Sequence, residues 1–177
     1  MRKINASAVL ALVLSSSVQA APDNTQLAVW ANEAIVATYS YDYKDFLSRQ
    51  REIAKYFTAK GWTAYSTALN DAKLPETVQK NAYYVSAVAT LPPELKTLDA
   101  NNWQATMPLL VVYKNPQYLQ KQTLQITITF APAPSGQGVR GFAITSLQSK
   151  VIKPAYQCKP DSDTLNADEN QQPPDVK

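Results

Sequence analysis

The first half of the chain repeats its apolar side chains at the spacing of an α-helix. Between residues 24 and 39, Leu27, Trp30 and Ala34 recur every three or four positions. This spacing places them on one side of a helix, so the segment predicts a helix with an apolar stripe.

A second helix is predicted from the apolar face formed by Phe46, Ile53 and Phe57. Asp42 is the candidate residue to cap its start. Gly61 stands where this helix is expected to end in a left-handed conformation. Further helical segments are predicted from Trp62, Tyr65 and Leu69, and from Pro75, a favoured first helical residue.

After Asn81 the apolar residues recur at every second position instead. Alternation is clearest over residues 123–130, as in an antiparallel strand with one buried face. Other strands are predicted at residues 83–91, 109–113 and 139–149. Helices followed by roughly four strands predict an α+β fold, in which N-terminal helices pack on an antiparallel sheet.

Both ends of the chain differ in composition from this central part. Arg2 and Lys3 precede a short apolar run, three serines and Val18-Gln19-Ala20, which is the pattern of a secretory signal cleaved after Ala20. Residues 159–177 hold five acidic residues against two lysines and predict an acidic disordered tail. The 177 residues therefore divide into a signal at 1–20, one domain at 21–158 and a tail at 159–177.

The amino-acid composition argues against the common catalytic and metal-binding sites in this domain. The chain has no histidine and a single cysteine, Cys158, so the usual general base and the usual zinc ligands are missing. We expect no catalytic residue, cofactor or metal. Its charged residues form no lysine and arginine cluster of the kind that nucleic acid requires. The letters of a dinucleotide-binding loop occur at residues 136–141, but a strand follows them, so they predict a hairpin connection.

Nine of the seventeen aromatic residues lie between residues 30 and 65. Tyrosines there are expected mostly to cover the sheet, with one or two at the surface, and basic residues follow them on the second helix. Such basic residues are usually a solvated helix face, and contact with an anionic partner or with lipid headgroups is the alternative. The candidate partner interface consists of Tyr39, Tyr41, Tyr43, Arg49 and Arg51.

The same aromatic segment resembles the DotI/IcmL family. The resemblance rests on residues 30–47, on Tyr56-Phe57-Thr58 and Gly61-Trp62, and on later segments at residues 107–113, 122–130 and 138–144. Together these segments extend over residues 25–150. The family supplies an inner-membrane component of type IVB (Dot/Icm) secretion systems.

The resemblance implies a periplasmic domain similar to the assembly-factor domain of VirB-type systems. Its fold would be nuclear transport factor 2-like, with helices in the hollow of a curved antiparallel sheet. The implied activity is self-association and contact with secretion-complex proteins, without a reaction. Family members of the DotI type carry a transmembrane helix before this domain, whereas a segment with the pattern of a cleavable signal stands there in this sequence. We therefore expect an exported periplasmic protein, with an uncleaved N-terminal anchor in the inner membrane as the alternative.

Two other functions stay open at the level of the sequence. A cone-shaped fold can enclose a pocket, which would suit a small-ligand carrier or an isomerase-like enzyme. Such an enzyme would need a tyrosine beside a carboxylate, and the candidate carboxylates are Asp42, Asp45, Asp71 and Asp99. The other function is that of a secreted effector or surface-active protein.

Overall fold

The structure is a computed structural model that describes residues 22–157. The expected signal at 1–20, the tail at 159–177 and Cys158 lie outside the described residues. In chain order the elements are α1 (Asn24–Thr38), β1 (Tyr41–Asp42), α2 (Phe46–Ala54), α3 (Ala59–Asp71), α4 (Leu74–Lys80), β2 (Tyr84–Ala89), β3 (Glu94–Asp99), β4 (Asn102–Lys114), β5 (Leu119–Pro132) and β6 (Phe142–Gln157).

The helical half confirms the predicted pattern and corrects two of its details. α1 begins after Asp23, whose carboxylate accepts a hydrogen bond from the Gln26 amide at 2.7 Å. Asp42 does not cap α2, because the helix begins later, after Asp45. The Asp42 carboxylate instead accepts hydrogen bonds from the backbone N–H groups of Lys44 and Asp45, and so holds the turn before the helix.

The prediction for Gly61 is wrong. This glycine lies inside α3, at the point where the helix meets the first residues of β6. A β-carbon at this position would stand 2.6 Å from the carbonyl oxygen of Ile144. The residue is therefore needed for a close approach between helix and strand, and not for a helix end.

Within residues 22–157 the sheet contains six antiparallel strands, two more than the number expected. Five of them follow the order β1-β2-β4-β5-β6, and β3 pairs with the other part of the same β4 edge. The two extra strands are β1, which has only two residues, and β3, whose side chains are almost all exposed. Neither segment has the apolar alternation from which a strand is recognised in sequence. The 133–141 segment joins β5 to β6 as the predicted hairpin connection, with positive φ angles at all three of its glycines.

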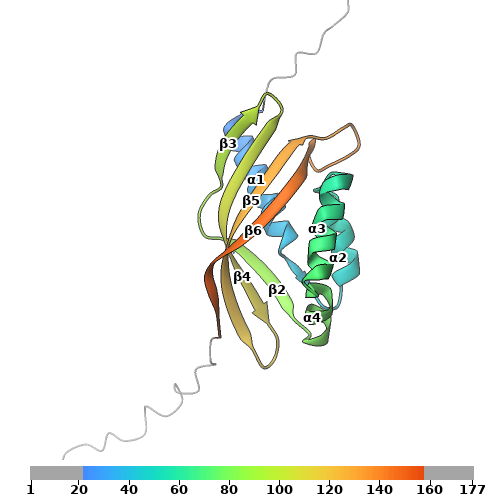
Figure 1. The fold of residues 1–177 in the computed structure, drawn as a ribbon, viewed down its shortest axis with the longest axis vertical. Helices are drawn as coiled ribbons and strands as arrows, with labels where there is room; N and C mark the ends of the chain where they lie inside the picture. Colours follow the sequence, from blue (N-terminus) through green and yellow to red (C-terminus); the bar gives the residue numbers. More distant parts are fainter. Residues whose placement is uncertain (1–21, 158–177) are drawn as a thin grey trace, which may run out of the picture.

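Alternation along β4 and β5 divides the sheet into a buried face and an outer face. Inward side chains from both strands belong to the same buried core as the inward face of α1, including Trp103, Met107, Ile126 and Phe130. Figure 1 shows the sheet curving, with α2, α3 and α4 gathered on one side of it. The combination of helices and a curved antiparallel sheet confirms the predicted α+β class.

Candidate functional site

The five residues of the predicted partner interface lie in different environments. The Tyr41 side chain is 6% exposed and belongs to the core, and Tyr39 packs half-buried against that core. Tyr43 and Arg49 are partly exposed, and Arg51 is exposed. The Arg49 Nε atom donates a hydrogen bond to the Ser40 carbonyl oxygen at 2.8 Å, which fixes its side chain against the end of α1. The surface therefore presents Tyr43, Arg49 and Arg51, whereas Tyr39 and Tyr41 contribute to the interior.

A cluster of buried tyrosines lies behind this surface. Burial raises the pKa of Tyr39 from its ordinary value of 10.0 to about 12, an effect partly offset by a hydrogen bond with Ser149. Burial also raises the pKa values of Tyr41, Tyr65 and Tyr113. The hydroxyl of Tyr65 donates to the Thr38 carbonyl oxygen at 3.2 Å. These phenols are thus held in the neutral form and act as structural groups.

Stability is expected to fall at high pH because of this cluster. The folded protein holds the Tyr39 proton more tightly than the unfolded chain does, with a pKa of about 12 against 10.0. The stabilisation is therefore complete below the unfolded pKa and is lost as the pH rises through the folded one. Urea midpoints should decrease across that window. Tyr39→Phe should reduce the decrease, and Tyr118→Phe, at a 49% exposed tyrosine, should leave it unchanged. If the urea midpoints of both variants decrease equally with rising pH, the decrease does not come from Tyr39.

Tyr43 forms a surface patch with two neighbours. Its ring meets that of Tyr84 edge to face with the centroids 5.4 Å apart. The Lys44 ammonium lies 5.8 Å from the Tyr43 centroid and 5.9 Å from that of Tyr84. Tyr84 is 42% exposed, and it lines a depression of about 390 Å³ together with Arg49. We call Tyr43, Lys44 and Tyr84 the tyrosine–lysine patch. The sequence interpretation missed Tyr84, because the register of β1 and β2 brings it beside this segment.

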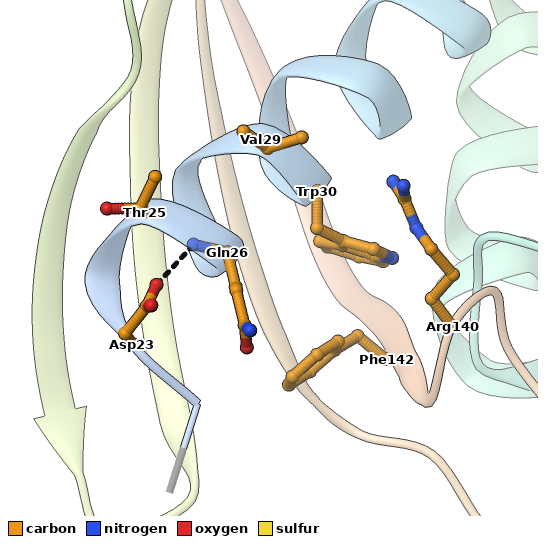
Figure 2. Close-up of a pocket in the computed structure, with 7 residues that line it drawn as sticks. All are labelled: Asp23, Thr25, Gln26, Val29, Trp30, Arg140 and Phe142. Carbon is orange, nitrogen blue, oxygen red and sulfur yellow. Dashed lines mark hydrogen bonds between the residues drawn. The ribbon is translucent and has the colours of Figure 1, made fainter.

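A second hollow of about 400 Å³ lies at the start of α1, and Figure 2 shows the side chains around it. Trp30 and Phe142 form its apolar wall, and their ring centroids are 5.7 Å apart. Arg140 stands at its rim and forms an ion pair with Glu33. The other carboxylate oxygen of Glu33 accepts a hydrogen bond from the Tyr56 hydroxyl at 2.9 Å. The remaining lining residues are Asp23, Thr25, Gln26 and Val29.

Among the contacts of the described residues, Glu33 and Tyr56 are the pair that most resembles a catalytic carboxylate and tyrosine. Glu33 is not among the candidate carboxylates of the sequence analysis. Both oxygens of Glu33 already have partners, and its side chain is 43% exposed. Buried apolar side chains fill the space between the sheet and the helices, and among them Phe130 is fully buried and Phe57 only 6% exposed. The pair therefore lies at the surface and not in an enclosed pocket, and its geometry suits a structural contact.

Residues 22–157 contain neither a cluster of metal-ligating side chains nor a helix that could span a membrane. No three histidine, cysteine or acidic side chains in this range come close enough to hold a metal ion. None of the helices in the same range is long and apolar enough to cross a membrane. The same residues carry the tyrosine–lysine patch, the hollow of Figure 2 and the outer face of the sheet on their surface.

Comparison with solved structures identifies close relatives of the domain. The structure is similar to an IcmL-like type IV secretion system protein from Legionella pneumophila, with 65% identity and a TM-score of 0.74 over 78% of this chain and 100% of that one. It is also similar to the periplasmic domain of DotI, with 24% identity and a TM-score of 0.68 over 74% of this chain and 97% of that one. Among curated proteins no match was found.

More distant similarities confirm the predicted fold. VirB8 from Agrobacterium tumefaciens shares it at 11% identity, with a TM-score of 0.53 over 77% of this chain and 99% of that one. A nuclear transport factor 2-like protein from Salmonella enterica shares it at a TM-score of 0.50, with 11% identity over 73% of this chain and 91% of that one. A family of type-IV b secretion system proteins, described as an inner-membrane complex component, matches residues 9–151. The chain therefore belongs to the DotI/IcmL family of type IVB secretion system components.

Proposed function

We propose that this protein is an exported protein-interaction domain that works in or beside a type IVB secretion complex, without catalysing a reaction. The observation that carries the proposal is the family match over residues 9–151, together with the 65% identical IcmL-like secretion protein. The filled interior of the sheet supports it, because the domain offers surfaces for partners and not an enclosed reaction chamber.

The periplasm is the proposed location. The signal-like segment at residues 1–20 and the similarity to the DotI periplasmic domain both support it. In that compartment the domain would meet the periplasmic parts of secretion subunits and further copies of itself. An uncleaved N-terminal segment would hold the same domain at the inner membrane. Fractionation with mass measurement of the N-terminus distinguishes these two forms.

The tyrosine–lysine patch is the proposed contact surface for a protein partner. Tyrosines combine apolar area with a hydroxyl and are enriched at interface positions that dominate binding energy. Tyr84 is 42% exposed, and the adjacent Lys44 adds a positive charge. Arg49 and Arg51, from the interface predicted in the sequence, lie in α2 just after this patch in the chain and extend its basic character.

Removing both tyrosine rings should weaken the complex. We expect Tyr43→Ser with Tyr84→Ser to lower the recovery of identified secretion subunits about tenfold, as loss of about 1.4 kcal/mol of binding energy requires. Tagged protein would be crosslinked and purified from envelopes of cells that carry the apparatus, and its partners quantified by mass spectrometry. Tyr118→Ser is the matched control, since this tyrosine is 49% exposed in the β4–β5 turn. If wild-type protein recovers no secretion subunit and no second copy of itself, the proposed function is wrong.

A further inference from the structure

The outer face of the sheet is uncovered over β4, β5 and β6. Side chains on this face alternate with the core positions, and none of those on β4 or β5 is buried. On β6 the outward Ala143, near the hairpin, is buried, and the outward side chains from Ser146 to Lys153 are exposed. In Figure 1 the helices α2, α3 and α4 lie away from these strands' outer side, and α1 contacts the inward positions. A broad sheet face with no covering layer is thus available within the described residues.

Lysines gather at one end of this face. Lys121 of β5 lies opposite Val112 of β4, and Thr123, two positions further along, lies opposite Lys153 of β6. Lys114 is therefore a diagonal neighbour of Lys121 on the same face, and such neighbours are roughly 7–8 Å apart. Lys153 lies diagonally across from Lys121 on the other side, where β6 has a register shift between the partners of Lys121 and Thr123. Lys150 continues the row, opposite Gln125. We call Lys114, Lys121, Lys150 and Lys153 the lysine strip.

The described part of the chain supplies these lysines with no acidic partner. From residue 100 to residue 157 the sequence contains no aspartate or glutamate at all. The salt bridges of residues 22–157 join Lys55 to Glu52 and Arg140 to Glu33, and none includes the lysine strip. Asp42 lies two strands from Lys114, but its carboxylate accepts hydrogen bonds from the Lys44 and Asp45 backbone. Like charges in neighbouring positions repel each other, so the strip favours an anionic ligand.

An acidic segment of the same chain begins at the end of this strip. β6 ends at Gln157, opposite Gln120, one residue before Lys121 on β5. The residues that follow include Asp161, Asp163, Asp168, Glu169 and Asp175. An extended chain advances about 3.3 Å per residue, so the first of these carboxylates can return to the strip within a few residues.

We propose that the acidic segment 159–177 binds in cis to the lysine strip on the outer face of the sheet. Tethering makes the contact feasible, because a short linker gives an effective concentration of ~1 mM. If the segment binds the strip with a Kd of ~1 mM, equal to this effective concentration, the contact is formed in about half of the molecules. The bound segment covers the strip and competes with other anionic molecules for it. This inference does not rest on the proposed secretion function, since both partners belong to one chain.

Paramagnetic NMR on the full chain tests the contact directly. A spin label would be placed at Asn170→Cys, beside Asp168 and Glu169, with Cys158→Ser removing the only native thiol. We expect selective signal loss at the amides around Lys121, Lys150 and Lys153. Because the contact is electrostatic, it should be strong at about 0.01 M salt and abolished at about 1 M, where the screening length is near 3 Å.

Charge variants identify the groups responsible. Neutralising the five acids of the segment with Asn or Gln should remove the signal loss, and so should Lys121→Gln, Lys150→Gln and Lys153→Gln combined. The matched control is Lys55→Gln, Lys60→Gln and Lys80→Gln, which removes equal charge from the helices and the C-cap of α2. Signal loss that persists in the strip variant, or centres on the helices, would overturn the proposal. So would signal loss that also occurs between separately labelled molecules, because the segment would then bind a second copy.

Discussion

Trp30→Ala is expected to lower the free energy of unfolding by about 4 kcal/mol, the cost of emptying an aromatic site in a packed core. Trp30 is 2% exposed, and its ring centroid lies 4.9 Å from that of Phe130 and 5.7 Å from that of Phe142. Through this ring α1 meets both β5 and β6. The substitution leaves a cavity where three elements join.

The indole also holds the β5–β6 hairpin. Its Nε1 atom donates a hydrogen bond to the Val139 carbonyl oxygen at 2.8 Å. Trp30→Phe keeps most of the apolar volume and removes this donor, so it should cost less than Trp30→Ala while loosening the hairpin. Amide hydrogen exchange at residues 138–142 would detect that loosening separately from global unfolding.

Urea unfolding measures the effect of Trp30→Ala on stability. The midpoint should fall while the slope stays the same, since the unfolded chain exposes a similar surface. Val29→Ala is the matched control: it lies one position earlier on α1, is 55% exposed and should change stability by less than about 0.5 kcal/mol. Similar losses for the two variants would show that Trp30 is not a central part of the core.

Patterns in the sequence predicted the elements whose side chains alternate between core and solvent. The clearest predicted strand, residues 123–130, lies within β5, and its even positions are buried as expected. β3 escaped prediction because it is an exposed edge segment paired only with β4, so burial imposes no pattern on it. β1 escaped because two residues cannot show a period.

The site features that the sequence missed depend on contacts between distant parts of the chain. Glu33 and Arg140 are separated by 107 positions, and only the folded hairpin brings them together. Tyr41 belongs to the predicted interface because it lies between two other tyrosines in the sequence. In the structure Tyr41 pairs with Val85 of β2, and its side chain is buried in the core. Local patterns describe which face of an element is apolar, and they carry no information about which element will cover that face.

Gly61→Val is expected to destabilise the fold by about 3 kcal/mol, because a side chain there must displace backbone atoms. The added β-carbon would lie 2.6 Å from the Ile144 carbonyl oxygen and 3.1 Å from that of Thr145. The β6 backbone at this point cannot move aside as a flexible side chain can, because two hydrogen bonds hold it. The Ile144 N–H donates to the Tyr56 carbonyl oxygen at 2.7 Å, and the Ile144 carbonyl oxygen accepts from the Thr58 N–H at 2.9 Å.

The same contact explains why α3 is needed at the edge of the sheet. β6 pairs with β5 on one side only, so its other side would expose unpaired backbone groups at Ile144. Residues 56–58 supply hydrogen bonds there, and Gly61 lets α3 lie directly on the strand. Gly61→Val should therefore both lower the melting temperature by about 10 °C and accelerate amide exchange at Ile144.

Gly136→Ala separates this crowding from the general cost of losing a glycine. Gly136 has a φ of +78° and no atom within 4 Å of its added β-carbon, so its substitution should cost only about 1 kcal/mol through backbone strain. Its variant should leave exchange at Ile144 unchanged. If Gly61→Ala, with a single added carbon, also costs more than Gly136→Ala and exposes Ile144, then close packing of α3 against β6 is what requires the glycine. Equal costs for these two alanine variants, with exchange at Ile144 unchanged, would contradict this explanation. Helix propensity alone predicts that alanine at position 61 stabilises α3.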